Sequence, residues 1–117
     1  MITVIAGSGD FNDYEYMKEK LKMYYISKII SGGSKGADRL AELYAYENNI
    51  PKVIYKAQWD KYGKKAGMVR NVEMLKKCEF AIFFWDGKSP GTKQGIDYCK
   101  KHNINHIVFN YNEKSIF

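Results

Sequence analysis

A glycine-rich joint in the first third of the chain has the residue types of an anion-binding turn. The apolar run that ends at Ser31 is followed by Gly32 and Gly33, and Lys35 and Gly36 come directly before a helical pattern. At such a strand–turn–helix joint, free backbone N–H groups and the helix dipole favour an anion. Glycine suits positions where φ is positive or where a ligand approaches the backbone. The joint therefore predicts either a contact with a phosphate-bearing ligand or only a tight connection between strand and helix.

Three further loops follow β-rich runs and carry related residue types, namely glycine, serine, threonine and aspartate, or tryptophan and tyrosine. Their candidate ligand-binding residues are Gly7, Ser8 and Asp10 after the first run, Trp59 and Tyr62 after the third, and Trp85, Asp86, Gly87, Ser89, Gly91 and Thr92 after the fourth. Ligands of open α/β sheets bind beyond the carboxyl ends of the strands. Four such loops at one sheet edge therefore predict a nucleotide-sized pocket.

Several polar residues near these loops have both a structural and a ligand-binding interpretation. Asp38 stands in the first turn of a predicted helix, where a carboxylate also compensates the helix dipole. Arg70 suits a phosphate or carboxylate, and the alternative is a surface ion pair with Glu73. Ser89 or Thr92 either caps the last predicted helix or helps its free N–H groups to hold a phosphate.

A basic zone surrounds the aromatic residues of the third loop. The net charge of the chain is +6, from 19 basic and 13 acidic side chains. Residues 56–77 hold seven basic and two acidic side chains, a net of +5, which leaves +1 for the rest. Trp59 and Tyr62 lie in this zone and suit the stacking of a base, although Trp59 alternatively covers a sheet edge. The zone predicts a nucleotide or single-stranded nucleic acid as partner, or only a solvated surface.

β-rich runs alternate with helical patterns along the chain. Strands are predicted at residues 2–6, 27–31, 52–56, 80–85 and 106–110, and helices at residues 14–24, 35–48, 67–78 and 92–103. This alternation predicts an α/β protein with one Rossmann-like three-layer domain, in which a mostly parallel five-stranded sheet has helices on both faces. The domain is expected to span residues 1–117, with residues 111–117 as a short C-terminal appendage.

Helix patterns also predict caps and core residues. Asp10 or Asn12 is expected to cap the first helix, since both precede its apolar stripe. Met68, Met74 and Leu75 are expected to lie in the core.

Residues with catalytic chemistry are few. The sequence has no Ser/His/Asp arrangement and no cluster with metal-ligand spacing, so neither a metal nor a cofactor is expected. Asp10, Asp60 and Asp86 are the acids at the predicted ligand edge, where a pair of carboxylates would suit acid–base work on a glycosidic bond. Cys78 and Cys99 are expected to be reduced thiols of a cytoplasmic protein. No apolar run is long enough for a membrane span.

Four ordered motifs resemble the SLOG superfamily, and most of all its small stand-alone YspA-like, YpsA-related branch of bacteria and phages. The motifs are Gly7-Ser8-x-Asp10-Phe11, Ser31-Gly32-Gly33-x-x-Gly36-Ala37-Asp38-Arg39, Trp59-x-x-Tyr62-Gly63-x-x-Ala66-Gly67-x-x-Arg70-Asn71-x-x-Met74 and Phe84-Trp85-Asp86-Gly87-x-Ser89-x-Gly91-Thr92. The resemblance implies a Rossmann-like fold whose relatives bind nucleoside monophosphates, ADP-ribose-like molecules or single-stranded DNA. Because superfamily members often self-associate, it also implies a homo-oligomer.

The resemblance extends in part to the Lonely Guy hydrolases, which separate a base from a ribose phosphate with an arginine and a glutamate. Arg70-Asn71-x-x-Met74 is similar to their Arg-Lys-x-x-Met helix, which implies that Arg70 and Asn71 contact ligand. Gly95 occupies the position of their glutamate, and Gly9 stands where the branch usually carries arginine. We therefore expect a sensor or sequestering module for a nucleotide-derived ligand. A phosphoribohydrolase-like enzyme is the alternative, and single-stranded nucleic-acid binding is a third possibility.

Overall fold

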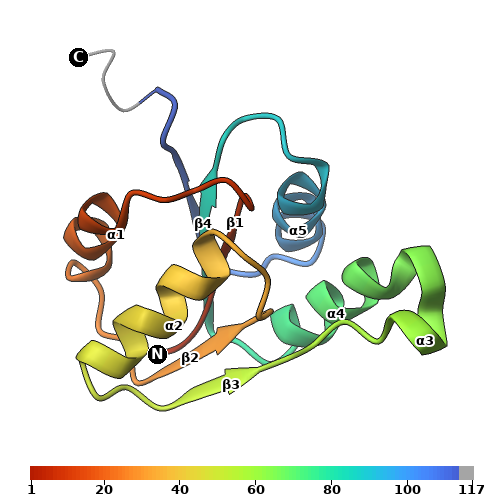
Figure 1. The fold of residues 1–117 in the computed structure, drawn as a ribbon, viewed down its shortest axis with the longest axis horizontal. Helices are drawn as coiled ribbons and strands as arrows, with labels where there is room; N and C mark the ends of the chain where they lie inside the picture. Colours follow the sequence, from red (N-terminus) through yellow and green to blue (C-terminus); the bar gives the residue numbers. More distant parts are fainter. Residues whose placement is uncertain (114–117) are drawn as a thin grey trace.

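The computed structural model describes residues 1–113 and has three layers, with a parallel sheet between two pairs of helices (Figure 1). The strands are β1 (Ile2–Gly7), β2 (Lys28–Ser31), β3 (Lys52–Ile54), β4 (Phe80–Trp85) and β5 (His106–Asn110). Their order in the sheet is β3-β2-β1-β4-β5, and every neighbouring pair is parallel. This confirms the predicted Rossmann-like α/β fold. Of the predicted appendage, residues 114–117 lie outside the described part.

The helices cover the two faces of the sheet in pairs. On one face α1 (Tyr14–Leu21) and α2 (Ala37–Glu47) bury their apolar stripes against Ile5, Ile82 and Phe84. On the other face α4 (Ala66–Leu75) and α5 (Pro90–Lys101) pack on Val4, Ile30, Ala81 and Phe83. Successive residues of a strand point to opposite faces, so a strand covered on both sides must be apolar throughout. This explains the continuous apolar run of β4.

The structure contains one helix that the sequence patterns did not predict. The short helix α3 (Trp59–Tyr62) and a 3₁₀ turn at Gly63–Lys65 occupy a segment that was expected to be a loop. A single turn is too short to show a hydrophobic period, so no pattern could indicate it. The predicted helix at residues 35–48 begins later, at Ala37, because Gly36 has a φ of 79°.

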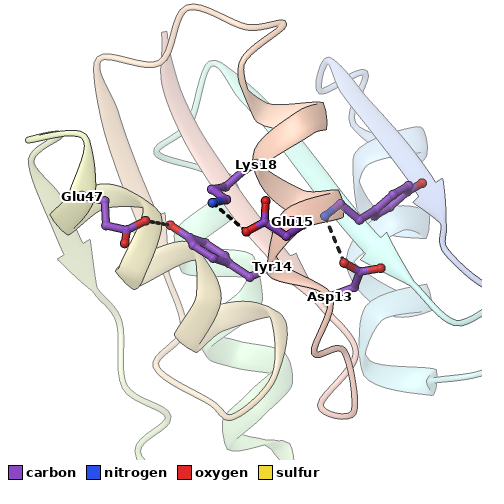
Figure 2. A network of polar contacts seen from close by, with 6 residues as sticks. Asp13, Tyr14, Glu15, Lys18 and Glu47 are labelled. Carbon is purple, nitrogen blue, oxygen red and sulfur yellow. Dashed lines mark hydrogen bonds and ion pairs between the residues drawn. The ribbon is translucent and has the colours of Figure 1, made fainter.

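Asp13 caps α1, so the expectation of Asp10 or Asn12 was wrong. Its carboxylate accepts a hydrogen bond from the backbone N–H of Tyr16 at 3.0 Å, which satisfies a free donor of the first turn (Figure 2). The Tyr14 hydroxyl donates a hydrogen bond of 2.5 Å to the Glu47 carboxylate and joins the start of α1 to the end of α2 (Figure 2). These contacts fix the start of α1 and tie it to α2, and none of their residues lines the cavity described below.

Tyr14→Phe is expected to lower the free energy of unfolding by about 1 kcal/mol, because the hydrogen bond to Glu47 is lost while the ring remains. Burial, followed by that hydrogen bond, raises the pKa of the Tyr14 phenol. Urea denaturation near pH 7 measures the change. Tyr25→Phe is the matched control, because the Tyr25 side chain is 83% exposed and should contribute nothing. Equal stability of wild type and Tyr14→Phe would contradict the prediction.

Among residues 1–113, no helix combines the length and apolarity that a membrane-spanning segment needs.

Candidate functional site

A cavity of about 330 Å³ opens beyond the carboxyl ends of β1 and β4. The strand order reverses between these two neighbours, since β1 leads through α1 to one side of the sheet and β4 leads through α5 to the other. The connections leave the sheet on opposite faces, which opens a crevice at this point in α/β folds. Its volume lies within the range of small-molecule sites.

The predicted ligand-binding residues divide into two groups. Those that line the cavity are Gly7, Ser8, Lys35, Asp38, Arg70, Asn71, Ser89, Gly91 and Thr92. Those that do not are Asp10, Ser31, Gly32, Gly33, Gly36, Trp59, Tyr62, Trp85, Asp86 and Gly87. Further lining residues that sequence reasoning did not select are Val4, Ala6, Gly9, Ser34, Met74, Leu75, Phe83 and Gly95. Three of the four predicted loops therefore meet at the cavity, together with α4.

Gly7 and Ser8 connect the end of β1 to β4 and α2 at the cavity. A Cβ at position 7 would lie 2.2 Å from the Phe84 carbonyl oxygen and 2.8 Å from the Ala37 Cβ. The Ser8 N–H donates to that same carbonyl at 3.0 Å, and the Ser8 hydroxyl accepts from the Asp86 N–H at 3.1 Å. The end of β1 is therefore locked between β4 and α2. Close packing alone accounts for glycine at position 7.

Asp86 shapes the loop that leads into α5. Its carboxylate accepts hydrogen bonds from the N–H groups of Lys88 and Ser89, at 2.8 and 2.7 Å, and from the Ser89 hydroxyl at 2.9 Å. These donors, led by the Ser89 N–H, lower the pKa of Asp86 to about 2. Gly87 supports the same turn with a φ of 86°, and the Trp85 indole N–H donates to the Ser89 carbonyl. Trp85, Asp86 and Gly87 therefore place Ser89 and the start of α5 at the cavity.

Arg70 is fixed to the ends of two strands. Its Nη1 donates to the carbonyls of Gly32 at 2.6 Å and Tyr55 at 3.3 Å, and its Nε donates to the Asn71 side chain at 2.9 Å. A Cβ at Gly32 would lie 2.6 Å from Nη1, so glycine leaves room for the guanidinium. Within residues 1–113 Arg70 forms no ion pair with Glu73, and its Nη2 has no protein acceptor. The guanidinium thus keeps donors available at the cavity wall.

Asp38 is the one carboxylate among the cavity-lining residues of the described chain. Its side chain is 6% exposed, and one of its oxygens accepts a hydrogen bond from the Ser34 N–H at 3.1 Å. Burial raises the pKa of Asp38 to about 6, although the Ser34 N–H and the Arg70 charge act in the opposite direction. Asp38 lies on the buried stripe of α2 together with Ala41 and Ala45, and this helical spacing places it on the inner side of the helix.

The carboxylates that the sequence singled out for catalysis lie elsewhere. Asp10 accepts a hydrogen bond of 2.6 Å from the Tyr111 hydroxyl, and Asp60 is exposed on α3. The Asp86 carboxylate accepts its hydrogen bonds within its own loop. None of these three residues lines the cavity. The structure therefore brings no pair of these three carboxylates together at the cavity.

The first turn of α5 presents free backbone donors to the cavity. Ser89 stands at the N-cap, where its side chain makes no capping hydrogen bond, and Pro90 has no N–H, so Gly91 and Thr92 carry the first free N–H groups. Within residues 1–113, a Cβ at Gly91 would meet no atom within 4 Å beyond its chain neighbours and its own helix backbone, and Gly91 has no positive φ. Packing therefore does not require glycine at position 91, in contrast to position 7.

Lys35 supplies a second cation. A Cβ at Gly9 would lie 3.5 Å from the Lys35 Cε, so the lysine side chain runs over Gly9. Lys35 itself is exposed and lines the cavity with Arg70. The cavity thus combines two cations with a carboxyl group whose pKa is raised towards neutrality.

The structure also places the predicted core residues and the remaining candidate residues. Met74 and Leu75 are buried as expected, but Met68 is 45% exposed, so its placement in the core was wrong. Ser31 is buried, and its hydroxyl donates to the Asp38 carbonyl. Trp59 and Tyr62 lie on α3, outside the cavity.

The sequence is similar to a described protein family and to a phage protein. The family model described as "YspA, cpYpsA-related SLOG family" matches residues 1–62. The chain is also similar to the Gene 61 protein of Mycobacterium phage D29, with 32% identity over 92 residues that cover 74% of this chain and 72% of the phage protein. No solved structure matches the chain significantly.

Proposed function

The chain belongs to the YspA, cpYpsA-related SLOG family, and from this premise we propose that its cavity binds a nucleotide or nucleotide-derived ligand. Membership in the family suggests a nucleotide-related function. The finer proposal is a nucleoside monophosphate or an ADP-ribose-like signalling molecule, which the protein senses or sequesters. The cavity volume of about 330 Å³ suits a ligand of the smaller kind, and a longer ligand would extend through its open side.

The start of α5 carries the proposal. Gly91 has neither a close neighbour nor a positive φ that would explain glycine, and its free N–H lies in the first turn of a twelve-residue helix. A missing side chain at this place lets a phosphate approach the N–H groups of Gly91 and Thr92. Arg70 and Lys35 line the same cavity and add two positive charges for the phosphate.

An apolar wall lies in the same cavity as these donors. Val4, Met74, Leu75 and Phe83 line it from the sheet and from α4. Flat apolar groups such as nucleobases gain from burial against such a wall, while their polar edges need only a few donors and acceptors. An anion site beside an apolar wall fits a nucleotide better than it fits a free phosphate.

A thermal-shift panel of nucleoside mono-, di- and triphosphates, ADP-ribose, NAD and cyclic dinucleotides tests the proposal, with chromatography of each mixture afterwards. A ligand that raises the melting temperature increasingly as its concentration rises, and that is recovered intact, would support a binding module. Inorganic phosphate is the control for simple anion binding. A panel without a shift at concentrations up to about millimolar would overturn the proposal.

Arg70→Lys is expected to weaken binding of the ligand found in the panel by about tenfold or more. Lysine keeps the charge, but it loses the planar fork that serves the strand carbonyls and a phosphate at once. Isothermal titration calorimetry measures the dissociation constant. Arg39→Lys is the matched control, because Arg39 is exposed on α2 and does not line the cavity. Equal affinities of Arg70→Lys and Arg39→Lys for the ligand would show that Arg70 does not contribute to binding.

A second candidate function is hydrolysis of the N-glycosidic bond of a nucleotide, and the observation that favours it concerns Asp38. A carboxyl group with a pKa of about 6 in a ligand cavity is suited to act as a general acid or base near neutral pH. Free base in the chromatograms, lost in Asp38→Asn while nucleotide binding persists, would establish this function. Intact nucleotides after long incubation would favour the binding module.

A further inference from the structure

The segment 56–65, here called the α3 arm, exposes two aromatic side chains that do not line the proposed nucleotide cavity. The arm lies at the periphery of the molecule, beyond the first turn of α4 (Figure 1). The Trp59 side chain is 61% exposed and that of Tyr62 is 37% exposed. Tryptophan is mostly covered in folded proteins, because its large apolar ring gains much from burial. An indole with this exposed fraction would gain free energy from burial against a binding partner.

The local geometry holds the two rings on one surface. Trp59 and Tyr62 are three residues apart on α3, which makes them neighbours on the helix surface. Gly67 of α4 lies beside the indole, since a Cβ there would be 3.8 Å from Trp59 Cη2. A shallow hollow of about 340 Å³ next to the indole is lined by Ala57, Gln58 and the start of α3. The two aromatic side chains therefore occupy neighbouring positions on one short helix, with open space beside the indole.

The arm is also strongly basic. It holds four exposed lysines, Lys56, Lys61, Lys64 and Lys65, against one carboxylate, Asp60, which gives a net charge of +3. Within residues 1–113, none of these lysines forms an ion pair with a carboxylate. The Lys61 ammonium lies 5.1 Å from the centroid of the Tyr62 ring, so a cation and a ring surface occur together. The charge of the arm is available for an anionic partner.

We propose that the α3 arm binds single-stranded nucleic acid. Unpaired bases stack on Trp59 and Tyr62, and the lysines neutralise the phosphates between those bases. A single strand fits better than a duplex, because paired bases do not expose their faces and a four-residue helix is too short to read a major groove. The arm and the nucleotide cavity share no lining residue, so this surface is separate from the proposed nucleotide site.

Fluorescence anisotropy of the full chain with a dye-labelled oligothymidylate of about 12 nucleotides tests this proposal. Saturable binding that weakens steeply with added salt is expected. Trp59→Ala should reduce the affinity about tenfold, while Trp59→Phe, which keeps a stacking ring, should retain most of it. Because the Trp59 side chain is exposed, both variants should fold as wild type does, and a thermal melt checks each protein.

A charge-matched pair of double variants separates the arm from the rest of the surface. Lys64→Gln with Lys65→Gln should flatten the dependence of affinity on salt, since fewer phosphates are neutralised. Lys100→Gln with Lys101→Gln removes the same charge from the exposed end of α5 and should change nothing. Arg70→Lys should also bind the strand normally, which distinguishes the arm from the cavity.

Three results would overturn the proposal. The first is absence of saturable binding at low salt. The second is an affinity that Trp59→Ala and Tyr62→Ala leave unchanged. The third is equal affinity for a duplex of the same length, because attraction of lysines to phosphates would then explain all of the binding.

Discussion

Gly7→Ala is expected to lower the free energy of unfolding by about 3 kcal/mol or more, or to prevent folding altogether. The added Cβ would lie 2.2 Å from the Phe84 carbonyl oxygen, and a second close approach of 2.8 Å would involve the Ala37 Cβ. Relief would require β1 to separate from β4, although the Ser8 N–H is bonded to that same carbonyl. Urea denaturation followed by circular dichroism measures the loss.

Gly91→Ala is the matched control for the Gly7→Ala substitution. In the described part of the chain, a Cβ at position 91 meets no atom within 4 Å outside its own helical turn. Alanine in a helical turn also restricts the unfolded chain more than glycine does. The stability of this variant should equal or slightly exceed that of wild type. Its affinity for the nucleotide should fall, because the methyl group enters the space proposed for the phosphate. A Gly7→Ala protein as stable as Gly91→Ala would show that the end of β1 is less tightly packed than described.

Asp38→Asn is expected to stabilise the protein at about pH 7, by up to about 3 kcal/mol. The pKa of Asp38 is raised from 3.8 to about 6 on folding, so the folded protein binds this proton more tightly than the unfolded chain. Stability from the neutral carboxyl is therefore fully present below about pH 4 and is lost as the pH rises towards and through about 6. Asparagine stays neutral and can still accept the hydrogen bond from the Ser34 N–H.

The difference between Asp38→Asn and wild type isolates this effect, and urea denaturation across the acid to neutral range measures it. The lowered pKa of Asp86 makes stability fall with acid between about pH 4 and 2, but it acts in both proteins and cancels in the difference. Asp60→Asn removes an exposed carboxylate on α3 and serves as the control. A stability difference for Asp38→Asn that does not change with pH would contradict the assigned burial of the carboxyl group.

Much of the fold could be predicted because local patterns and topology agree. The run Phe80–Trp85 is apolar throughout, which indicates a strand covered on both faces, and the structure places it between β1 and β5 with helices on each side. The alternation of elements then permits few arrangements, since crossovers between parallel strands are right-handed. Short elements escaped prediction. One turn of helix at Trp59–Tyr62 has no period to detect, and a single cap such as Asp13 depends on a backbone angle.

The sequence by itself determined the class of fold, the edge of the sheet where loops with ligand-binding residue types gather, and the presence of an exposed basic zone. Only the tertiary structure decided which loops meet. It brought Arg70 to the strand end at Gly32, 38 residues away, and placed Asp38 in the cavity while Asp10 and Asp86 form hydrogen bonds outside it. It also showed that close packing requires glycine at position 7 but does not require it at position 91. These distinctions depend on distances between atoms that are remote in sequence, and no local pattern records such distances.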